Sequence, residues 1–141
     1  MGVIGDKTGL VLEIGLGNGR TYDHLRSGLG AERIYAFDRA NNANPRSYPP
    51  ADRLILGEFA QTLPAFAAAH PGGAVLAHSD AGLGDPEANA RQMIMLADVL
   101  PLLLAPGGIL FSDQKMSHPA LLPQPMPVPI PPERYFMYIR A

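Results

Sequence analysis

The chain has 141 residues, of which 47% are hydrophobic and 17% charged, and this length and composition are typical of one globular domain. Its formal net charge of −2 and the scattered positions of its 11 basic residues argue against a nucleic-acid-binding or membrane-surface protein. The absence of cysteine excludes disulfides, thiolate metal sites and a cysteine nucleophile. Because the first residues do not resemble a signal peptide and no apolar stretch is long enough to span a bilayer, we expect a cytoplasmic protein.

Short apolar runs alternate with helical patterns along the first four fifths of the chain. The runs predict strands over residues 10–14, 34–37, 54–56, 74–78 and 109–111. The intervening patterns predict helices over residues 21–27, 62–70 and from 86 onward, and a loop over 41–50. Strands that are apolar throughout and joined by helices indicate a parallel sheet buried on both faces. The predicted fold is therefore an α/β, doubly wound, mostly parallel sheet of the Rossmann-like type.

The second and third helices carry terminal signals. Pro64 is expected in the first turn of the helix over 62–70, where a proline needs no amide hydrogen. Asp85 is the predicted cap of the next helix, followed by Pro86 at its first position. Pro101 is expected to kink that helix or to end its regular part. The apolar residues that this helix carries are Ile94, Leu96, Ala97, Leu100 and Leu103.

The C-terminal part of the chain is rich in proline. Between residues 118 and 132 a proline stands at every second position from Pro123 to Pro131, which predicts an extended, polyproline-like strap. Residues 135–139 form an aromatic run, which predicts a final antiparallel strand at the edge of the sheet. Residues 1–141 are thus expected to form a single domain, with 118–132 as a strap returning to the sheet edge.

Acidic residues and glycines follow the predicted strands. Since ligands of open α/β sheets bind at the carboxyl ends of the strands, these residues predict a ligand with hydroxyl groups and a positive charge. The residues in question are Glu13, Gly15, Gly17, Gly19, Asp38, Glu58, Asp80 and Asp113. A phosphate-binding loop is disfavoured because neither lysine stands in that motif. A nicotinamide-dependent dehydrogenase is also disfavoured, because Arg20 occupies the place of the third glycine of a dinucleotide turn.

Four motifs in order resemble those of class I S-adenosylmethionine-dependent methyltransferases. The run from Val11 to Gly19 is similar to the Glu-x-Gly-x-Gly-x-Gly first motif of that family, and Asp38 follows Gly19 by 19 residues. Residues 56–59 (Leu-Gly-Glu-Phe) and residues 103–110 (Leu-Leu-Ala-Pro-Gly-Gly-Ile-Leu) resemble two later motifs. The resemblance implies an enzyme that binds S-adenosylmethionine and releases S-adenosylhomocysteine.

The resemblance also implies roles for individual residues. Gly15 and Gly17 would let the backbone approach the methionine portion of the cofactor, and Glu13 would orient this loop or meet the ammonium group. Asp38 would accept hydrogen bonds from the ribose hydroxyls. Glu58 or the amide of Phe59 would contact adenine. The complete predicted cofactor-binding set is Glu13, Gly15, Gly17, Asn18, Gly19, Arg20, Thr21, Asp38, Arg39, Glu58, Phe59 and Asp80.

The predicted reaction is in-line methyl transfer, in which positioning of the acceptor supplies much of the rate. The candidate catalytic residues are His78, Asp80 and Asp113, with Lys115 and His118 as further candidates after the fifth strand. His78 has a second interpretation as a core histidine with a satisfied hydrogen bond. We expect a small-molecule acceptor, because the Asn/Asp-Pro-Pro-Tyr/Phe motif of enzymes that methylate nucleic-acid amines is absent.

Asp80, Asp113 and Gln114 resemble the metal ligands of catechol-type O-methyltransferases. Three oxygen ligands would suit magnesium, which would orient a hydroxylated acceptor and lower its pKa. Gln114 departs from that pattern because the family has asparagine there. Magnesium is therefore an alternative within the predicted function, whose main form needs no metal.

Other functions and an assembly state also follow from the sequence. The chain could be a cofactor-binding domain without turnover, such as a partner subunit; an aminopropyl transferase is disfavoured because its acidic glycine turn is not matched.

Only about nine residues precede the first strand, and the last predicted strand offers an aromatic edge. We therefore expect a homodimer in which a neighbour covers the cofactor cleft.

Overall fold

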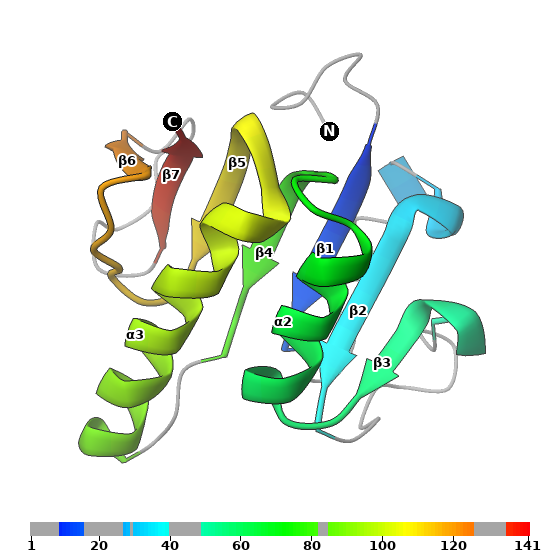
Figure 1. Cartoon of the computed structure of the whole chain (residues 1–141), viewed down its shortest axis with the longest axis horizontal. Coiled ribbons are helices and arrows are strands. Elements are labelled where there is room, and N and C mark those ends of the chain that lie inside the picture. Colours follow the sequence, from blue (N-terminus) through cyan, green and yellow to red (C-terminus); the bar gives the residue numbers. More distant parts are fainter. Residues whose placement is uncertain (1–8, 16–26, 29, 40–48, 82–84, 126–134) are drawn as a thin grey trace.

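The computed structural model describes residues 9–15, 27–28, 30–39, 49–81, 85–125 and 135–141. These residues form a seven-stranded sheet with the order β3-β2-β1-β4-β5-β7-β6. The strands are β1 (Leu10–Ile14), β2 (Ile34–Asp38), β3 (Leu54–Leu56), β4 (Ala74–Ser79), β5 (Leu104–Ser112), β6 (Leu121–Gln124) and β7 (Phe136–Arg140). The helices are α2 (Phe59–Ala69) and α3 (Pro86–Leu103), with 3-10 turns η1 (Ala31–Arg33) and η3 (Ala51–Arg53). Both α-helices lie on the same face of the sheet (Figure 1).

The sheet confirms the predicted fold class. Strands β1 to β5 are parallel, and β7 pairs antiparallel with β5 and β6. The chain passes from β1 outward to β2 and β3, and then returns to β4 on the other side of β1. The strand order therefore reverses between β1 and β4, and such a point is where open α/β sheets bind ligands.

Both faces of the central strands are buried, which explains their continuous apolar sequences. On the helix-covered face, Leu12, Ile14 and Phe37 belong to one core cluster with Leu63 of α2 and Leu100 of α3. A second cluster lies on the opposite face, where alternate residues of the same strands point. It contains Val11, Ile34, Ala36, Val75, Leu76 and Ile109. None of the helices in the described part of the chain is long and apolar enough to cross a membrane.

Helix α2 begins three residues earlier than predicted. The buried ring of Phe59 starts the helix, and the amides of Gln61 and Thr62 donate to the carbonyl of Glu58. Pro64 is therefore inside the helix rather than in its first turn, with its ring exposed to solvent. The sequence pattern missed this start because it gave more weight to the proline than to the apolar contact of Phe59.

Helix α3 begins as predicted, since the Asp85 carboxylate accepts a hydrogen bond from the Ala88 amide at 2.9 Å. Of the apolar residues that this helix carries, Ile94 lies at the surface, with its side chain 66% exposed. Pro101 is buried within the helix, which continues to Leu103. Strand β5 follows at once and begins at Leu104, five residues before its predicted start.

The antiparallel strands show where the proline-rich strap returns to the sheet. Its first part is the edge strand β6, in which Pro123 lies opposite Tyr138 of β7. A proline is tolerated there because an edge strand has one unpaired side. The aromatic strand β7 thus has a partner strand on each side. The sequence had predicted that this strand forms the edge of the sheet, and the expected dimer rested in part on that unpaired edge. Most of the predicted helix over 21–27, most of the loop over 41–50 and the later prolines of the strap lie outside the described residues.

Candidate functional site

A buried acidic residue and a histidine face each other at the point where the strand order reverses. Glu13 of β1 and His78 of β4 are register partners, each one residue before the end of its strand. The imidazole Nδ1 lies 2.8 Å from Glu13 Oε1. The Glu13 side chain is 1% exposed, and its Oε2 has no hydrogen-bond partner among the residues that the structure describes. The His78 side chain is 12% exposed. The centroids of the His78 and Tyr135 rings are 5.7 Å apart.

The surroundings raise the pKa values of both members of this pair. Burial raises the pKa of Glu13 above its ordinary value, and the hydrogen bond and charge of His78 offset part of that effect. For His78 burial alone would lower the pKa, but the hydrogen bond and charge of Glu13, with the charges of Asp80 and Asp113, raise it overall. The pair therefore retains a proton at a pH where an isolated histidine would have lost its own.

The predicted glycine turn begins with a close backbone contact. Gly15 has a φ of +84°, and its amide donates to the Phe37 carbonyl at 2.8 Å. A Cβ on Gly15 would overlap the carbonyl oxygen of Asp80. A glycine is therefore required by both the left-handed conformation and the packing of the β1 and β4 ends. The predicted residues Gly17, Asn18, Gly19, Arg20 and Thr21 lie outside the described residues.

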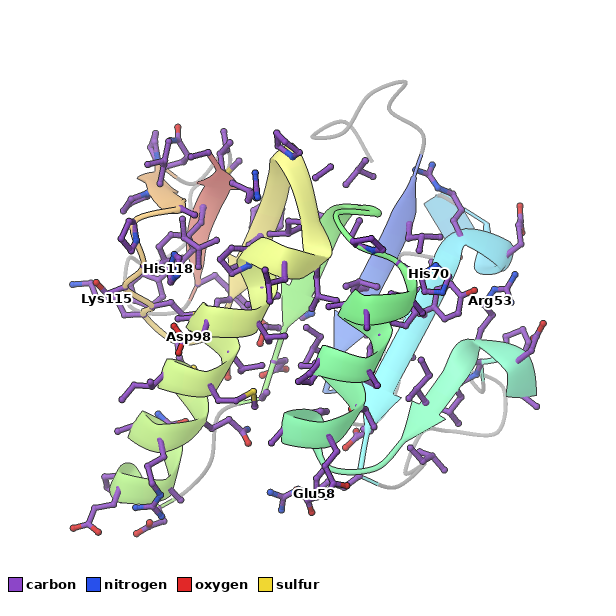
Figure 2. The ribbon with its side chains drawn as sticks, in the orientation of Figure 1. Arg53, Glu58, His70, Asp98, Lys115 and His118 are labelled. Carbon is purple, nitrogen blue, oxygen red and sulfur yellow. The ribbon has the colours of Figure 1, made fainter. Side chains whose placement is uncertain are left out.

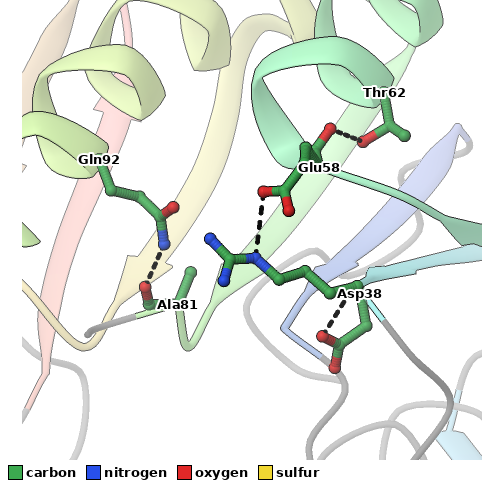
Figure 3. Close-up of polar contacts among 6 residues, drawn as sticks. Asp38, Glu58, Thr62, Ala81 and Gln92 are labelled. Atoms are coloured by element: carbon green, nitrogen blue, oxygen red, sulfur yellow. Dashed lines mark hydrogen bonds and ion pairs between the residues drawn. The ribbon is translucent and has the colours of Figure 1, made fainter. Parts of the chain in front are cut away.

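A second group of charged residues lies at the ends of β2 and β3 (Figure 3). The Asp38 carboxylate accepts a hydrogen bond from the Arg39 amide at 2.7 Å, and the Gly57 amide donates to the Asp38 carbonyl at 2.9 Å. The Nε of Arg39 lies 3.1 Å from the Glu58 carboxylate, and both side chains are more than half exposed. The predicted residues Asp38, Arg39, Glu58 and Phe59 are thus brought together by the adjacent strand ends.

An open cleft of about 270 Å³ continues from this group toward α3. Its lining includes Arg39, Glu58, Phe59, Arg91, Gln92 and Met95. The Gln92 amide donates to the carbonyl of Ala81, which ties the α3 side of the cleft to the segment after β4 (Figure 3). Sequence reasoning missed the α3 residues. Their spacing along one helix face was a usable signal, but it does not reveal which face meets α2.

The remaining predicted residues are only partly assembled. Asp80 is exposed after β4, and it acts on His78 through its charge, as does Asp113. Gln114 Oε1 accepts a hydrogen bond from Asn89 Nδ2 of α3 at 3.2 Å, and within the described ranges no three acidic or histidine residues are grouped to hold a metal ion. The oxygen donors predicted for magnesium therefore do not fit such a site well.

Two candidates after the fifth strand, Lys115 and His118, lie far from Glu58 (Figure 2). Lys115 is exposed, and His118 Nδ1 accepts a hydrogen bond from the Ala120 amide at 3.0 Å. Figure 2 shows both beside β6 and far from Glu58. His118 therefore stabilises a local turn, and no contact among the described residues links it to the pair at β1 and β4.

Both the sequence and the fold of this chain have matches among known proteins. A family model described as S-adenosyl-L-methionine methyltransferase matches residues 3–140. The chain is 37% identical to the S-adenosyl-L-methionine methyl transferase of Silicibacter pomeroyi DSS-3, with a TM-score of 0.92 and coverage of 99% of this chain and 86% of that one. No curated protein matches the sequence.

More distant structures share the fold alone. The antibiotic-resistance methyltransferase Kmr is 12% identical with a TM-score of 0.57, and covers 99% of this chain and 89% of its own. The 16S rRNA (adenine(1408)-N(1))-methyltransferase of Catenulisporales acidiphilia, whose structure was solved as a W203A mutant with its cosubstrate, is 14% identical with a TM-score of 0.54. It covers 99% of this chain and 88% of its own.

Proposed function

Because this chain belongs to the S-adenosyl-L-methionine methyltransferase family, we propose that it binds its methyl donor across the carboxyl ends of β1, β2 and β3 and transfers the methyl group to a small molecule. The observation that carries the binding site is the cleft lined by Arg39, Glu58 and Phe59, with Asp38 directly before Arg39 at the end of β2. It stands beside the β1 end, where the strand order reverses.

Each residue of this group offers the chemistry that the nucleoside part of the donor requires. A carboxylate at the end of β2 can accept hydrogen bonds from two ribose hydroxyls, and we assign this role to Asp38. The side chain of Glu58 and the amide of Phe59 are placed for adenine, whose ring suits a cleft lined by Phe59 and Met95. The exposed ion pair between Arg39 and Glu58 contributes at most about 1 kcal/mol, so that Glu58 can exchange this partner for a ligand.

The glycine turn is assigned to the methionine part of the donor. We assign Gly15 to the shape of this turn, because the Asp80 carbonyl takes the place of a Cβ there. Gly17, Asn18, Gly19, Arg20 and Thr21 are assigned to the contacts with the methionine part. The bound donor supplies an electrophilic methyl group. The task left to the chain is to hold the acceptor in line with that group, to exclude water and to take up a proton when the acceptor loses one.

A small acceptor is favoured by the charge of the molecule. The strand ends carry Asp38, Glu58, Asp80 and Asp113, and the net charge of the chain is −2. A polyanion such as RNA binds mainly through lysine and arginine contacts to phosphates, and an acidic edge opposes this. Although the 16S rRNA methyltransferase above acts on RNA, its likeness to this chain is one of fold. A homodimer and a cytoplasmic location remain predictions.

Calorimetric titration with S-adenosylhomocysteine tests the binding site. We expect the wild-type protein to bind, and Asp38→Ala to weaken binding by about tenfold or more, since a charge-assisted hydrogen bond contributes roughly 1.5–3 kcal/mol. Asp98→Ala is the matched control, because Asp98 is an exposed acidic residue of α3 outside the cleft lining. Absence of binding by the folded protein, or equal affinity for wild type and Asp38→Ala, would contradict the assignment.

A labelling experiment tests the acceptor. The protein is incubated with methyl-labelled S-adenosylmethionine and, separately, with a protein-free extract of small metabolites and with total RNA. We expect label to enter the small-molecule fraction only, and the Asp38→Ala variant to show little incorporation. Label in RNA would overturn the small-molecule assignment, whereas binding without incorporation in either fraction would support a cofactor-binding domain without turnover.

A further inference from the structure

The pair formed by Glu13 and His78 has a position that the binding of the nucleoside does not explain. The two residues face each other on β1 and β4, the strands between which the sheet order reverses. By the alternation of strand side chains they lie on the sheet face that carries Val11 and Leu76, away from α2 and α3. They are thus separated by the sheet from the apolar core under the helices, and lie within one residue of the ligand-binding edge.

A purely structural role accounts poorly for this pair. Burying a carboxylate is costly unless its oxygens are hydrogen-bonded, and an apolar pair of similar size is often at least as stable. Here Glu13 is 1% exposed, and its Oε2 lacks a hydrogen-bond partner in the described part of the chain. A group that is expensive to bury and only half satisfied is typical of a functional site.

The hydrogen bond determines which imidazole nitrogen can react. Nδ1 is 2.8 Å from Glu13 Oε1, and opposite an ionised Glu13 the neutral imidazole carries its proton on Nδ1 and keeps the lone pair on Nε2. The same carboxylate–imidazole arrangement orients the base in hydrolases that use a histidine. The Tyr135 ring at 5.7 Å restricts the orientation of the imidazole, whose 12% exposure leaves part of it accessible.

We infer that His78 Nε2 accepts the proton that the methyl acceptor loses, and that Glu13 is the positioning residue that holds the imidazole for this step. The inference rests on the proposed methyl transfer. A lone pair of the acceptor nitrogen or oxygen forms the new bond to the methyl carbon, the carbon–sulfur bond breaks and its electron pair stays on sulfur. The N–H or O–H proton of the acceptor moves to Nε2 of the neutral imidazole, the form present above the raised pKa of His78, which gives an imidazolium paired with the Glu13 carboxylate.

The charges around His78 favour the product of this step. Three carboxylates raise the pKa of His78: Glu13 of β1, Asp80 after β4 and Asp113 after β5. The uncharged ring of Tyr135, before β7, packs against the imidazole. These carboxylates stabilise the imidazolium more than the neutral ring. The acceptor class that follows is a nitrogen or oxygen nucleophile that still carries its proton when it binds, in preference to a carboxylate or a thioether.

The experiment compares the pKa of His78 in two complexes of the wild-type protein by NMR with labelled histidine. S-adenosylmethionine carries a positive sulfonium where S-adenosylhomocysteine has a neutral sulfur, so that a nearby imidazolium is repelled only in the first complex. We expect the pKa of His78 to be lower by about one unit in the S-adenosylmethionine complex. Two positive charges less than about 10 Å apart repel each other enough for such a shift at an effective dielectric constant of about 20. His70, at the far end of α2, should show equal values and is the internal control.

The same spectra test the role of Glu13. We expect neutral His78 to carry its proton on Nδ1, and Glu13→Gln to lower its pKa without changing that of His70; Glu13→Asp serves as a second variant if the first does not fold. Equal His78 pKa values in the two complexes, or a neutral form protonated on Nε2, would overturn the inference. If neither compound binds, the proposed function fails instead, so that the two failures are distinguishable.

Discussion

Gly15 is the residue at which the local backbone and the tertiary contact make the same demand. Its φ of +84° disfavours any other L-residue, and a Cβ would overlap the Asp80 carbonyl oxygen. Gly107 also has a positive φ, of +80°, but a Cβ there would meet no atom within 4 Å. The two glycines therefore separate the effect of backbone strain from that of packing.

We predict that Gly15→Ala lowers the free energy of unfolding by more than Gly107→Ala, which should cost about 1 kcal/mol for the strained conformation alone. At Gly15 the added methyl group must also displace the β1 and β4 ends, and we expect binding of S-adenosylhomocysteine to weaken at least tenfold. Urea denaturation and calorimetry on both variants measure these effects. Equal stability losses would show that the contact with Asp80 relaxes without cost.

The pair of Glu13 and His78 makes stability depend on pH. The pKa of His78 is raised in the folded chain, so that its contribution is complete below the unfolded value of about 6.5 and is lost as the pH rises through the folded value. The raised pKa of buried Glu13 acts in the same direction, because the folded chain again binds the proton more tightly. The two effects have the same sign.

We therefore predict that the melting temperature of the wild-type protein falls between pH 6 and pH 9. Glu13→Gln removes the main group that raises the pKa of His78, and this variant should lose most of the pH dependence. Thermal denaturation monitored by circular dichroism at several pH values provides the measurement. If the melting temperature falls with pH equally steeply in the wild-type protein and in Glu13→Gln, other groups cause the pH dependence.

At the scale of elements, β7 organises the segment that follows β5. It lies between β5 and β6, and the hydroxyl of its buried Tyr138 accepts a hydrogen bond from the Met116 amide at 2.8 Å. This contact fastens the chain between β5 and β6 to the sheet. Because the partners are 22 residues apart in the sequence, no local pattern predicts it.

We predict that Tyr138→Phe lowers the free energy of unfolding by about 1–3 kcal/mol, because the Met116 amide loses its acceptor in a buried position. Tyr35→Phe is the control, since the Tyr35 ring packs against Phe66 and is only partly buried. We expect the control to change stability by much less in urea denaturation. A negligible effect of Tyr138→Phe would indicate that water replaces the lost acceptor.

At the scale of the whole molecule, the proposed binding site joins elements that fold together. The cleft lining comes from the end of β2, the start of α2 and the first half of α3. A ligand that binds only the folded state stabilises all of these elements at once. Binding should therefore appear as a shift of the global unfolding transition.

We predict that S-adenosylhomocysteine at 100 times its dissociation constant raises the free energy of unfolding by about 2.7 kcal/mol. For a chain of this size this corresponds to a rise in melting temperature of very roughly 10 °C. Differential scanning calorimetry measures the shift, and Asp38→Ala at the same ligand concentration should show a smaller one. An unchanged melting temperature of the wild-type protein would argue against the proposed site.

The assembly state was expected from two features, and the structure alters one of them. The aromatic strand β7 is covered on its outer side by β6, a short edge strand that contains Pro123. Proline on an edge strand opposes pairing with a second sheet. A dimer built through this edge is thereby disfavoured, and light scattering in solution decides whether the cleft is covered by another copy in a different way.

Sequence alone was sufficient for the existence of the five parallel strands and of β7, for the order of the motifs and for the cap of α3, because these depend on local signals. Apolar runs mark the buried parallel strands, and Asp85 followed by Pro86 marks a helix start through contacts within four residues. The acidic residues at the strand ends were visible for the same reason. The family was indicated by the resemblance of the motifs that contain them.

Only the tertiary structure decided which of these residues meet. The start of α2 at Phe59, the exposure of Ile94 and the pairing of β6 with β7 depend on contacts between distant segments. The pairing of Glu13 with His78 joins residues 65 positions apart through the register of β1 and β4. Local propensity carries no information on that register, because burial of both sheet faces and the crossover between the strands determine it.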